Sequence, residues 1–289
     1  MLTLKQMKKI ISIASGLTLV LCSNFVSGVG NPKNVIVALG PWDGSAPEVV
    51  GALSDQKWLN SGESAKLIAG DTFKFFSHAA STGSFKAGKP ESMGMPCEET
   101  FSVPLNPNHK SKAFEIGGTA TWNPRPRTVT VLPNTSLAYV KIASEFLAKK
   151  GLKNTLVKLT SVIKTDFDND KTDEVFMVGR HFQESSSGDY FPPAGGKKGD
   201  YSFVLLRKIV AGKVQTISLM DDVNLKDIDI EANNRHLEML YDIAGLLDLT
   251  GDGKLEMVAY SAYYEGYNFE IMLWNGKKFV SKASSGCGA

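Results

Sequence analysis

The second half of the chain contains the same order of strand and turn signals twice, and this internal repeat constrains the fold most strongly. Each copy has a strand-like segment, a short acidic turn, two further strands and a Gly-Lys turn before a last strand. The copies span about residues 155–222 and 237–283. Alternating strands and tight turns are typical of an antiparallel meander. The sequence therefore predicts a mainly β fold that contains two four-stranded meanders.

The first copy of the repeat is longer than the second because it contains an insertion. The acidic turn and the strand after it are offset by 82 residues (248 − 166). The strand that begins at Tyr201 aligns with the one that begins at Tyr267, an offset of 66 (267 − 201). The difference of 16 residues (82 − 66) lies around 183–199 in the first copy, where Ser, Gly and Pro are frequent. Such composition predicts a surface loop.

Two different regions precede the repeats. A helix is predicted over 137–150, where apolar residues such as Ile142 and Phe146 follow the spacing of one buried face, with Ser136 as its N-cap. Residues 31–135 have short strand-like pieces between Gly- and Pro-rich turns and are predicted to form irregular β structure. We therefore divide the mature chain into residues 31–135 and 136–289.

The first thirty residues have the pattern of a signal peptide. Three lysines precede an apolar stretch over 10–21, and small residues follow near 28–30. Cys22 follows the bulky Leu21, which does not favour a lipoprotein signal. The apolar stretch is short for a membrane span, and no other apolar run of 18 residues follows. We therefore expect a secreted or periplasmic protein without a transmembrane span in its mature chain.

Charge and cysteine content restrict the partners and the compartment. Without the leader the chain has 29 basic residues (32 − 3) and 30 acidic ones, and it has no basic stripe. Nucleic-acid binding is therefore not expected. Cys97 and Cys287 remain after cleavage, and an even pair in an oxidising compartment predicts a disulfide, with two unpaired thiols as the alternative.

The two acidic turns have the spacing of a calcium loop. The first runs from Asp166 to Glu174 and the second from Asp248 to Glu256. Oxygen-bearing side chains at positions 1, 3 and 5, followed by an acid at position 9, can surround a hard cation such as Ca²⁺. An EF-hand requires a glutamate at position 12 between two helices, whereas these turns lie between strands and have Met or Ala there.

An acid at position 9 that enters a strand resembles the calcium hairpin of FG-GAP/VCBS repeats. The helix, the acidic hairpins, Tyr263-Tyr-Glu-Gly266 and the terminal Gly286-Cys-Gly-Ala289 are similar to bacterial secreted proteins with VCBS-like repeats. The resemblance implies one or two Ca²⁺ ions and propeller-like blades. Two blades cannot close a ring, so packing as a sandwich is the alternative. The implied ligands are Asp166, Asp168, Asp170, Thr172 (carbonyl) and Glu174 in the first turn, and Asp248, Thr250, Asp252, Lys254 (carbonyl) and Glu256 in the second.

Each turn departs from the family pattern at one position. The first has Lys171 where glycine is expected, and the second has Thr250 where an acid is expected at position 3. Both sites should therefore be weak, with dissociation constants of about 10⁻⁴ to 10⁻³ M. This range favours a structural role over sensing. The alternative is that one or both turns are free of metal.

The sequence offers no catalytic motif, so function is inferred from the repeats. The four histidines are scattered, and HExxH, GxSxG and P-loop motifs are absent. Tyr190 and Phe191 in the insertion and Tyr263 and Tyr264 in the last hairpin are candidates for a surface that binds a protein or a carbohydrate, with core filling as the alternative. We expect an exported, non-catalytic scaffold or binding module of the cell envelope. The alternative is a glycosidase-like hydrolase with a carboxylate-lined cleft.

Overall fold

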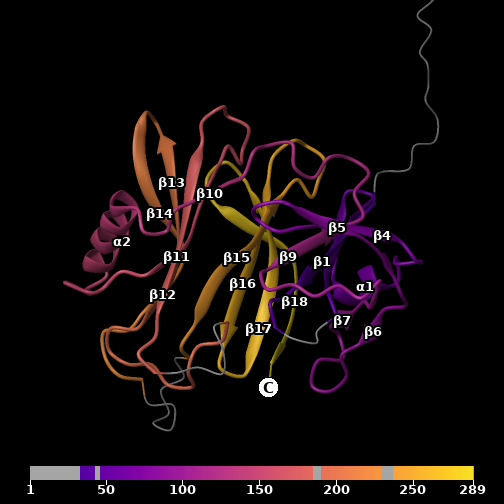
Figure 1. Ribbon diagram of the computed structural model, residues 1–289, viewed down its shortest axis with the longest axis horizontal. Helices are drawn as coiled ribbons and strands as arrows, with labels where there is room; N and C mark the ends of the chain where they lie inside the picture. The colour runs from indigo at the N-terminus through magenta and orange to yellow at the C-terminus, as the bar shows by residue number, and fades with distance from the viewer. Residues whose placement is uncertain (1–32, 43–45, 185–189, 229–236, 289) are drawn as a thin grey trace, which may run out of the picture. The chain divides into compact units, whose positions relative to one another are not determined.

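The computed structural model describes residues 33–42, 46–184, 190–228 and 237–288. The predicted signal peptide and Cys22 lie outside these residues. The described part of the chain is mainly β and consists of three antiparallel sheets and two helices (Figure 1). The predicted fold class is therefore confirmed.

The first sheet has nine strands in the order β6-β7-β2-β1-β9-β4-β5-β8, with β3 paired to β2. Its elements are β1 (Asn34–Leu39), β2 (Glu48–Ser54), β3 (Lys57–Leu59), α1 (Ser61–Ala65), β4 (Thr72–Phe76), β5 (Ser81–Ala87), β6 (Glu91–Ser92), β7 (Phe101–Ser102), β8 (Leu105–Asn106) and β9 (Glu115–Gly118). Strand β1 is buried on both faces: Val35 and Val37 pack on one side, and Ile36 packs on the other. The region predicted to be irregular β structure thus contains a sheet with a core of its own.

The second and third sheets are the predicted meanders. The second sheet consists of β10 (Thr130–Leu132), β11 (Leu159–Thr165), β12 (Glu174–His181), β13 (Tyr201–Val210) and β14 (Lys213–Val223), and the third of β15 (Leu240–Leu247), β16 (Glu256–Tyr263), β17 (Gly266–Trp274) and β18 (Phe279–Gly288). In both sheets the neighbouring strands follow one another in the sequence. Strand β10 precedes the boundary predicted at residue 136, yet it pairs with β11 and extends the first meander to five strands.

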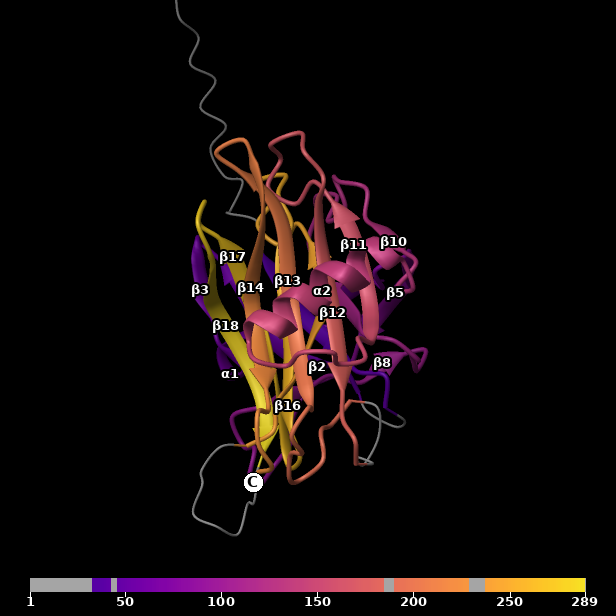
Figure 2. The same cartoon turned by 90° about the vertical axis from the view of Figure 1, so that its left-hand side faces the viewer.

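The predicted helix is α2 (Leu137–Lys149), which covers the outer face of the second sheet (Figure 2). Ala143 and Leu147 are buried against this sheet, as the apolar spacing predicted. Ser136 is the N-cap residue as predicted, but its side chain makes no capping hydrogen bond. The buried face of the helix, rather than a side-chain cap, therefore holds α2 in place.

The third sheet lies between the other two. Residues of the second and third sheets share one core, which includes Ile163, Phe176, Val178, Val204, Leu206, Leu246, Met257 and Ala259. Residues of the third and first sheets share another, which includes Ile36, Ala38, Val50, Ile116, Val258, Tyr260, Phe269 and Ile271. The meanders therefore pack face to face with the first sheet as a three-sheet stack.

The two meanders have the same orientation in this stack. Phe176 faces the third sheet, and Val258, 82 positions later, faces the first sheet. Val204 likewise faces the third sheet, and Phe269, 65 positions later, faces the first. Equivalent faces of the two meanders thus point in the same direction along the stack, as they do in consecutive propeller blades. The sheet that packs on the far face of the third sheet is, however, the first sheet, which is not a further copy of the repeat. Of the two packing alternatives, the described residues adopt the sandwich.

The predicted alignment of the third strands is wrong by one residue. His181 pairs with Tyr201, and the equivalent Tyr263 pairs with Gly266, so the structural offset is 65 (266 − 201) and not 66. Tyr201 belongs to the core under α2, whereas Tyr267 packs against the core shared with the first sheet. Because side chains alternate along a strand, a shift of one residue places two tyrosines with similar neighbours in the sequence on opposite faces.

The predicted disulfide is confirmed. Cys97 and Cys287 are bonded across a sequence separation of 190 residues and link the loop after β6 to β18. The bond therefore joins the first sheet to the third. Among the described residues, none of the helices has both the length and the apolar character to cross a membrane.

Candidate functional site

The two acidic turns lie side by side. The first connects β11 to β12 and the second connects β15 to β16. The Leu255 N–H donates to the carbonyl of Phe167 at 2.7 Å, and both side chains are buried in the core between the meanders. Residues 166–174 and 248–256 therefore form one structure, which we name the acidic joint.

The first turn brings several carboxylates together. Asp166 accepts hydrogen bonds from the backbone N–H groups of Asp170 and Lys171, at 3.0 and 3.2 Å. Asp166, Asp168 and Glu174 each offer a ligand oxygen, and these oxygens lie within 4.8 Å of one another. Such a group can hold a metal ion, and oxygen ligands favour a hard cation.

The backbone of the first turn adopts a conformation that usually requires glycine. Asn169 and Lys171 have φ angles of 64° and 70°. The equivalent residues of the second turn are Gly251 and Gly253, both with φ of 81°. The predicted departure at Lys171 is thus a left-handed residue, which costs roughly 1 kcal/mol relative to glycine. The N–H of Thr172 donates to Asp170 at 2.8 Å and closes the turn.

A lysine from another strand occupies the first turn. Lys208 on β13 places its Nζ 2.9 Å from Asp168, 2.9 Å from Asp170 and 2.7 Å from Glu174. Its side chain is 9% exposed, and that of Glu174 is fully buried. These three acids are the predicted calcium ligands at positions 3, 5 and 9. The Lys208 ammonium thus contacts the oxygens that a metal ion in this turn would use.

The acidic partners of Lys208 stabilise its charged form. Burial opposes the charged form, but hydrogen bonds to Glu174, Asp168 and Asp170 outweigh this effect and raise the pKa of Lys208 above its ordinary value. Lys208 therefore stays protonated at neutral pH. A calcium ion can take the same carboxylate oxygens only if the ammonium leaves them.

The second turn has a similar backbone but lacks such a lysine. Asp248 accepts the N–H groups of Gly251 and Gly253, at 2.6 and 3.0 Å, and Glu256 accepts that of Leu249 at 2.6 Å. Asp248 and Glu256 are 2% and 4% exposed. At the structural offset of 65, the position of Lys208 corresponds to Leu273 (208 + 65). No cationic side chain of β17 therefore reaches these buried acids.

The electrostatics of the second turn follow from this difference. Burial raises the pKa of Glu256 to about 8, because the charged form has lost its hydration without gaining a counter-ion. Thr250 Oγ1 is buried and has no hydrogen-bond partner among the described residues. The one lysine paired to this turn is Lys254, 3.4 Å from Asp252, and both side chains are about half exposed. Among the described residues, no cationic side chain therefore pairs with the buried carboxylates of Asp248 and Glu256.

A segment before β10 fixes the second turn from the outside. Trp122 Nε1 donates to the carbonyl of Asp248 at 2.9 Å, and the Asp248 N–H donates to the carbonyl of Pro124 at 2.8 Å. Arg127 Nε donates to the carbonyl of Gly253 at 3.2 Å. The acidic joint thus connects the two meanders with the chain that leads out of the first sheet.

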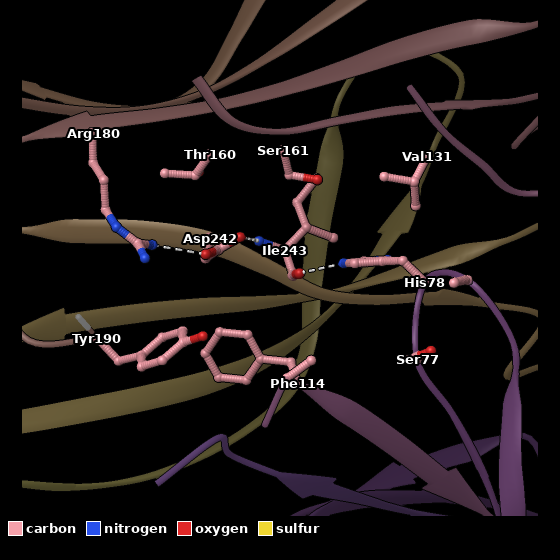
Figure 3. Close-up of a pocket in the computed structure, with 12 residues that line it drawn as sticks. Ser77, His78, Phe114, Val131, Thr160, Ser161, Arg180, Tyr190, Asp242 and Ile243 are labelled. Carbon is pink, nitrogen blue, oxygen red and sulfur yellow. Dashed lines mark hydrogen bonds and ion pairs between the residues drawn. The ribbon is translucent and has the colours of Figure 1, made fainter. Parts of the chain in front are cut away.

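A cavity of about 310 Å³ lies where the three sheets meet (Figure 3). Arg180 on β12 and Asp242 on β15 form an ion pair at 2.9 Å, with side chains that are 16% and 13% exposed. The Arg180 guanidinium lies over the ring of Tyr190, 5.4 Å from its centroid. His78 donates from Nε2 to the carbonyl of Ile243 at 2.7 Å, and burial lowers the pKa of this histidine. Neutral His78 therefore has an acceptor at Nδ1, which has no partner among the described residues.

The aromatic residues predicted to form a ligand surface are half-buried and lie in two places. Tyr190 lines the three-sheet cavity, and Phe191 packs against Trp42, with ring centroids 6.1 Å apart. Tyr263 and Tyr264 lie together in the β16–β17 hairpin, with centroids 5.9 Å apart. The four rings do not form one platform. Their role in binding stays a prediction.

Sequence reasoning missed three groups of this site: Lys208, the Arg180–Asp242 pair and His78. Lys208 had one visible signal, because it closely follows the apolar run Val204-Leu-Leu206 in a predicted strand. The other two groups come from three different sheets, and only the tertiary packing brings them together.

Comparison of the chain with protein-family models, with curated proteins and with solved structures finds no match. The resemblance to FG-GAP/VCBS repeats therefore stays a prediction.

Proposed function

We propose that this chain is an exported, non-catalytic β-repeat protein in which a calcium ion stabilises the acidic joint, and that it serves as a scaffold or binding module of the cell envelope. The observation that carries the proposal is the contact between the two acidic turns, Leu255 N–H to Phe167 carbonyl, in the core that joins the meanders. A cation bound here stabilises the whole stack, because both sheets contribute to the joint.

Charge balance supports the second turn as the first to take Ca²⁺. In the first turn the ion competes with the Lys208 ammonium, which already contacts three carboxylates. In the second turn Asp248 and Glu256 are buried, and no cationic side chain in the described part of the chain pairs with them. Burying charged carboxylates without a counter-ion costs folding free energy, because they lose their hydration, and a bound divalent ion offsets this loss. The unpartnered Thr250 Oγ1 is a further oxygen for a hard cation.

The pockets support binding over hydrolysis. A glycosidase requires two carboxyl groups on either side of the scissile bond. The three-sheet cavity has one carboxylate, Asp242, which is paired with Arg180. A second cavity beside Trp42 also has one, Glu48. Neither arrangement provides the pair, whereas Tyr190 and the hydroxyl-bearing lining of the three-sheet cavity suit a small polar ligand such as a sugar.

Export is supported by two features. The first thirty residues have the pattern of a signal peptide, and the disulfide between Cys97 and Cys287 is compatible with an extracellular location. The near-neutral charge of the mature sequence gives no reason to expect a nucleic-acid partner.

Calorimetric titration of the purified mature protein with Ca²⁺ tests the proposal. We expect one ion per chain, with a dissociation constant of about 10⁻⁴ to 10⁻³ M. Asp252→Ala in the second turn should abolish this binding, whereas Asp170→Ala in the first turn should retain it. Absence of binding by the unmodified protein, or retained binding in Asp252→Ala, would contradict the assignment.

A further inference from the structure

A second cavity, of about 250 Å³, lies between the first and third sheets, away from the acidic joint. Its lining includes Trp42, Glu48 on β2, Met93, Tyr267 and Phe269 on β17. The cavity thus has aromatic rings, one thioether and one carboxylate. None of these groups belongs to the calcium loops or to the three-sheet cavity.

Glu48 is a buried acid that has no cationic partner within the described residues. The residue is 4% exposed. Its Oε2 accepts a hydrogen bond from the Tyr267 hydroxyl at 2.7 Å, while Oε1 has no hydrogen-bond partner among the described residues. The Ser285 hydroxyl lies nearby and favours the charged form of Glu48, although its Oγ has no partner at normal hydrogen-bond geometry among the described residues. Burial raises the pKa of the Glu48 carboxyl, as expected for an acid that has lost water without gaining a positive charge.

Several other buried acids of the protein have a cation or an imidazole beside them, although Asp248 and Glu256 of the second turn do not. Glu174 has Lys208 at 2.7 Å and Asp242 has Arg180 at 2.9 Å. Glu115, in the same sheet as Glu48, has His109 at 2.7 Å. Among the described residues, Glu48 is approached by hydroxyl groups rather than by a cation, and it borders a cavity. A positive charge in that cavity would provide the missing partner.

The rings of the cavity favour a positive charge as well. The Trp42 and Tyr267 centroids are 5.4 Å apart, and that of Phe269 is 6.3 Å from Trp42 and 5.9 Å from Tyr267. Aromatic faces attract cations through their quadrupole, and tryptophan does so most strongly. The Met93 sulfur lies 4.0 Å from the Tyr267 hydroxyl and adds a polarisable apolar wall. An organic cation can contact the aromatic faces and pair with the Glu48 carboxylate at the same time, whereas the water shell of a hydrated metal ion does not suit the apolar rings.

We propose that this cavity binds a small organic cation, an alkylammonium group, with Glu48 as its counter-ion and Trp42 and Tyr267 as its aromatic walls. The volume of about 250 Å³ restricts the bound group to a small one. This site is independent of the calcium proposal, because it shares no residue with the acidic joint.

The disulfide holds one rim of the cavity. The Met93 N–H donates to the carbonyl of Thr100 at 2.9 Å, and the Thr100 hydroxyl donates to the carbonyl of Gly286. The bond between Cys97 and Cys287 fastens the same loop to the end of β18. Reduction of this bond should therefore loosen the Met93 wall and weaken the binding of the cation.

Calorimetric titration of the intact mature protein with choline tests the proposal. The matched ligand is the uncharged alcohol in which carbon replaces the choline nitrogen, so shape and apolar area stay nearly the same. We expect choline to bind at least about tenfold more tightly than the alcohol. Equal affinity for the two ligands, or no binding of choline, would overturn the proposal. This comparison uses the unmodified protein and does not depend on the folding of a variant.

Two variants locate the site. Glu48→Gln should lose most of the choline binding, while Glu115→Gln, which changes another buried glutamate of the first sheet, should retain it. Retained binding in Glu48→Gln would place the cation elsewhere and overturn the assignment. The titration is repeated in calcium and in chelator. We expect equal choline affinity in both, so failure of the calcium proposal would leave this result unchanged.

Discussion

The Nζ atom of Lys208 lies 2.7 Å from Glu174 Oε1 and supplies, from within the chain, the positive charge that the first acidic turn requires. The second turn has Leu273 at the corresponding position and retains its buried acids without such a partner. The same backbone turn therefore occurs twice with different charge balance. The acidic joint combines one turn that contains an internal cation with one turn whose buried acids Asp248 and Glu256 pair with no cationic side chain among the described residues.

Lys208→Met should destabilise the protein strongly in the presence of chelator. Removing one partner of a buried ion pair leaves uncompensated charge and typically costs about 3–5 kcal/mol of unfolding free energy. Lys254→Met is the matched control, because its pair with Asp252 is exposed and worth at most about 1 kcal/mol. Urea unfolding measures both. Equal stability of Lys208→Met and the unmodified protein would show that Lys208 does not balance the first turn.

Asp242→Asn should also destabilise the protein, by about 3–5 kcal/mol, because it leaves the largely buried Arg180 unpaired. The double variant Arg180→Met with Asp242→Leu should lose less than the sum of the single changes, since it leaves no buried charge. Asp173→Asn is the control, because its pair with Lys164 is exposed. Additive losses in urea unfolding would mean that Arg180 and Asp242 are not coupled.

Glu238 should make stability fall as pH rises. Burial raises the pKa of its carboxyl from 4.5 to about 8, and nearby Asp222 and Asp200 act in the same direction. Between these values the unfolded chain is ionised while the folded one keeps its proton, so the unfolded state binds fewer protons and unfolding free energy decreases with pH. Glu238→Gln should reduce this dependence between pH 4.5 and about 8, while the part that Glu256 contributes remains. The exposed Glu145→Gln should not, and identical pH profiles for both variants would contradict the burial effect.

Loss of the disulfide should destabilise the protein even though the fold has a large core. Cys97 and Cys287 are 190 residues apart, and bridging a loop of this length contributes up to about 5 kcal/mol in the chain-entropy model. The paired change Cys97→Ser with Cys287→Ser should therefore lower the urea midpoint without changing the far-UV spectrum. An unchanged midpoint would mean that the disulfide adds no stability beyond that of the noncovalent contacts of β18.

The sequence was sufficient for features that depend on local pattern. Strand and turn signals predicted both meanders, the apolar spacing predicted α2, and the cysteine count predicted the bond between Cys97 and Cys287. The position of glycine in the second turn also indicated where Lys171 is forced into a left-handed conformation. The meanders, the helix and the turn follow from residues that are close in the sequence. The disulfide could be predicted because the mature chain contains only two cysteines.

The remaining features depend on register and packing. A shift of one residue in strand register would turn Lys208 from the first turn to the opposite face of the sheet. The sequence alignment of the two repeats was itself wrong by one residue in this strand, because it matched Tyr201 with Tyr267. The cavity with Arg180 and Asp242 needs three sheets in their folded arrangement. The sequence pattern of one strand cannot predict this cavity, because each of the three sheets contributes only part of its lining.

Thermal unfolding with and without calcium tests the central claim most directly. At about 10 mM Ca²⁺ and a dissociation constant of about 10⁻⁴ to 10⁻³ M, the ion should stabilise the protein by about 1.4–2.7 kcal/mol and raise its Tm by about 3–10 °C over that in chelator. Asp252→Ala should lose this rise. Identical melting curves of the unmodified protein in calcium and in chelator would contradict a calcium-stabilised acidic joint.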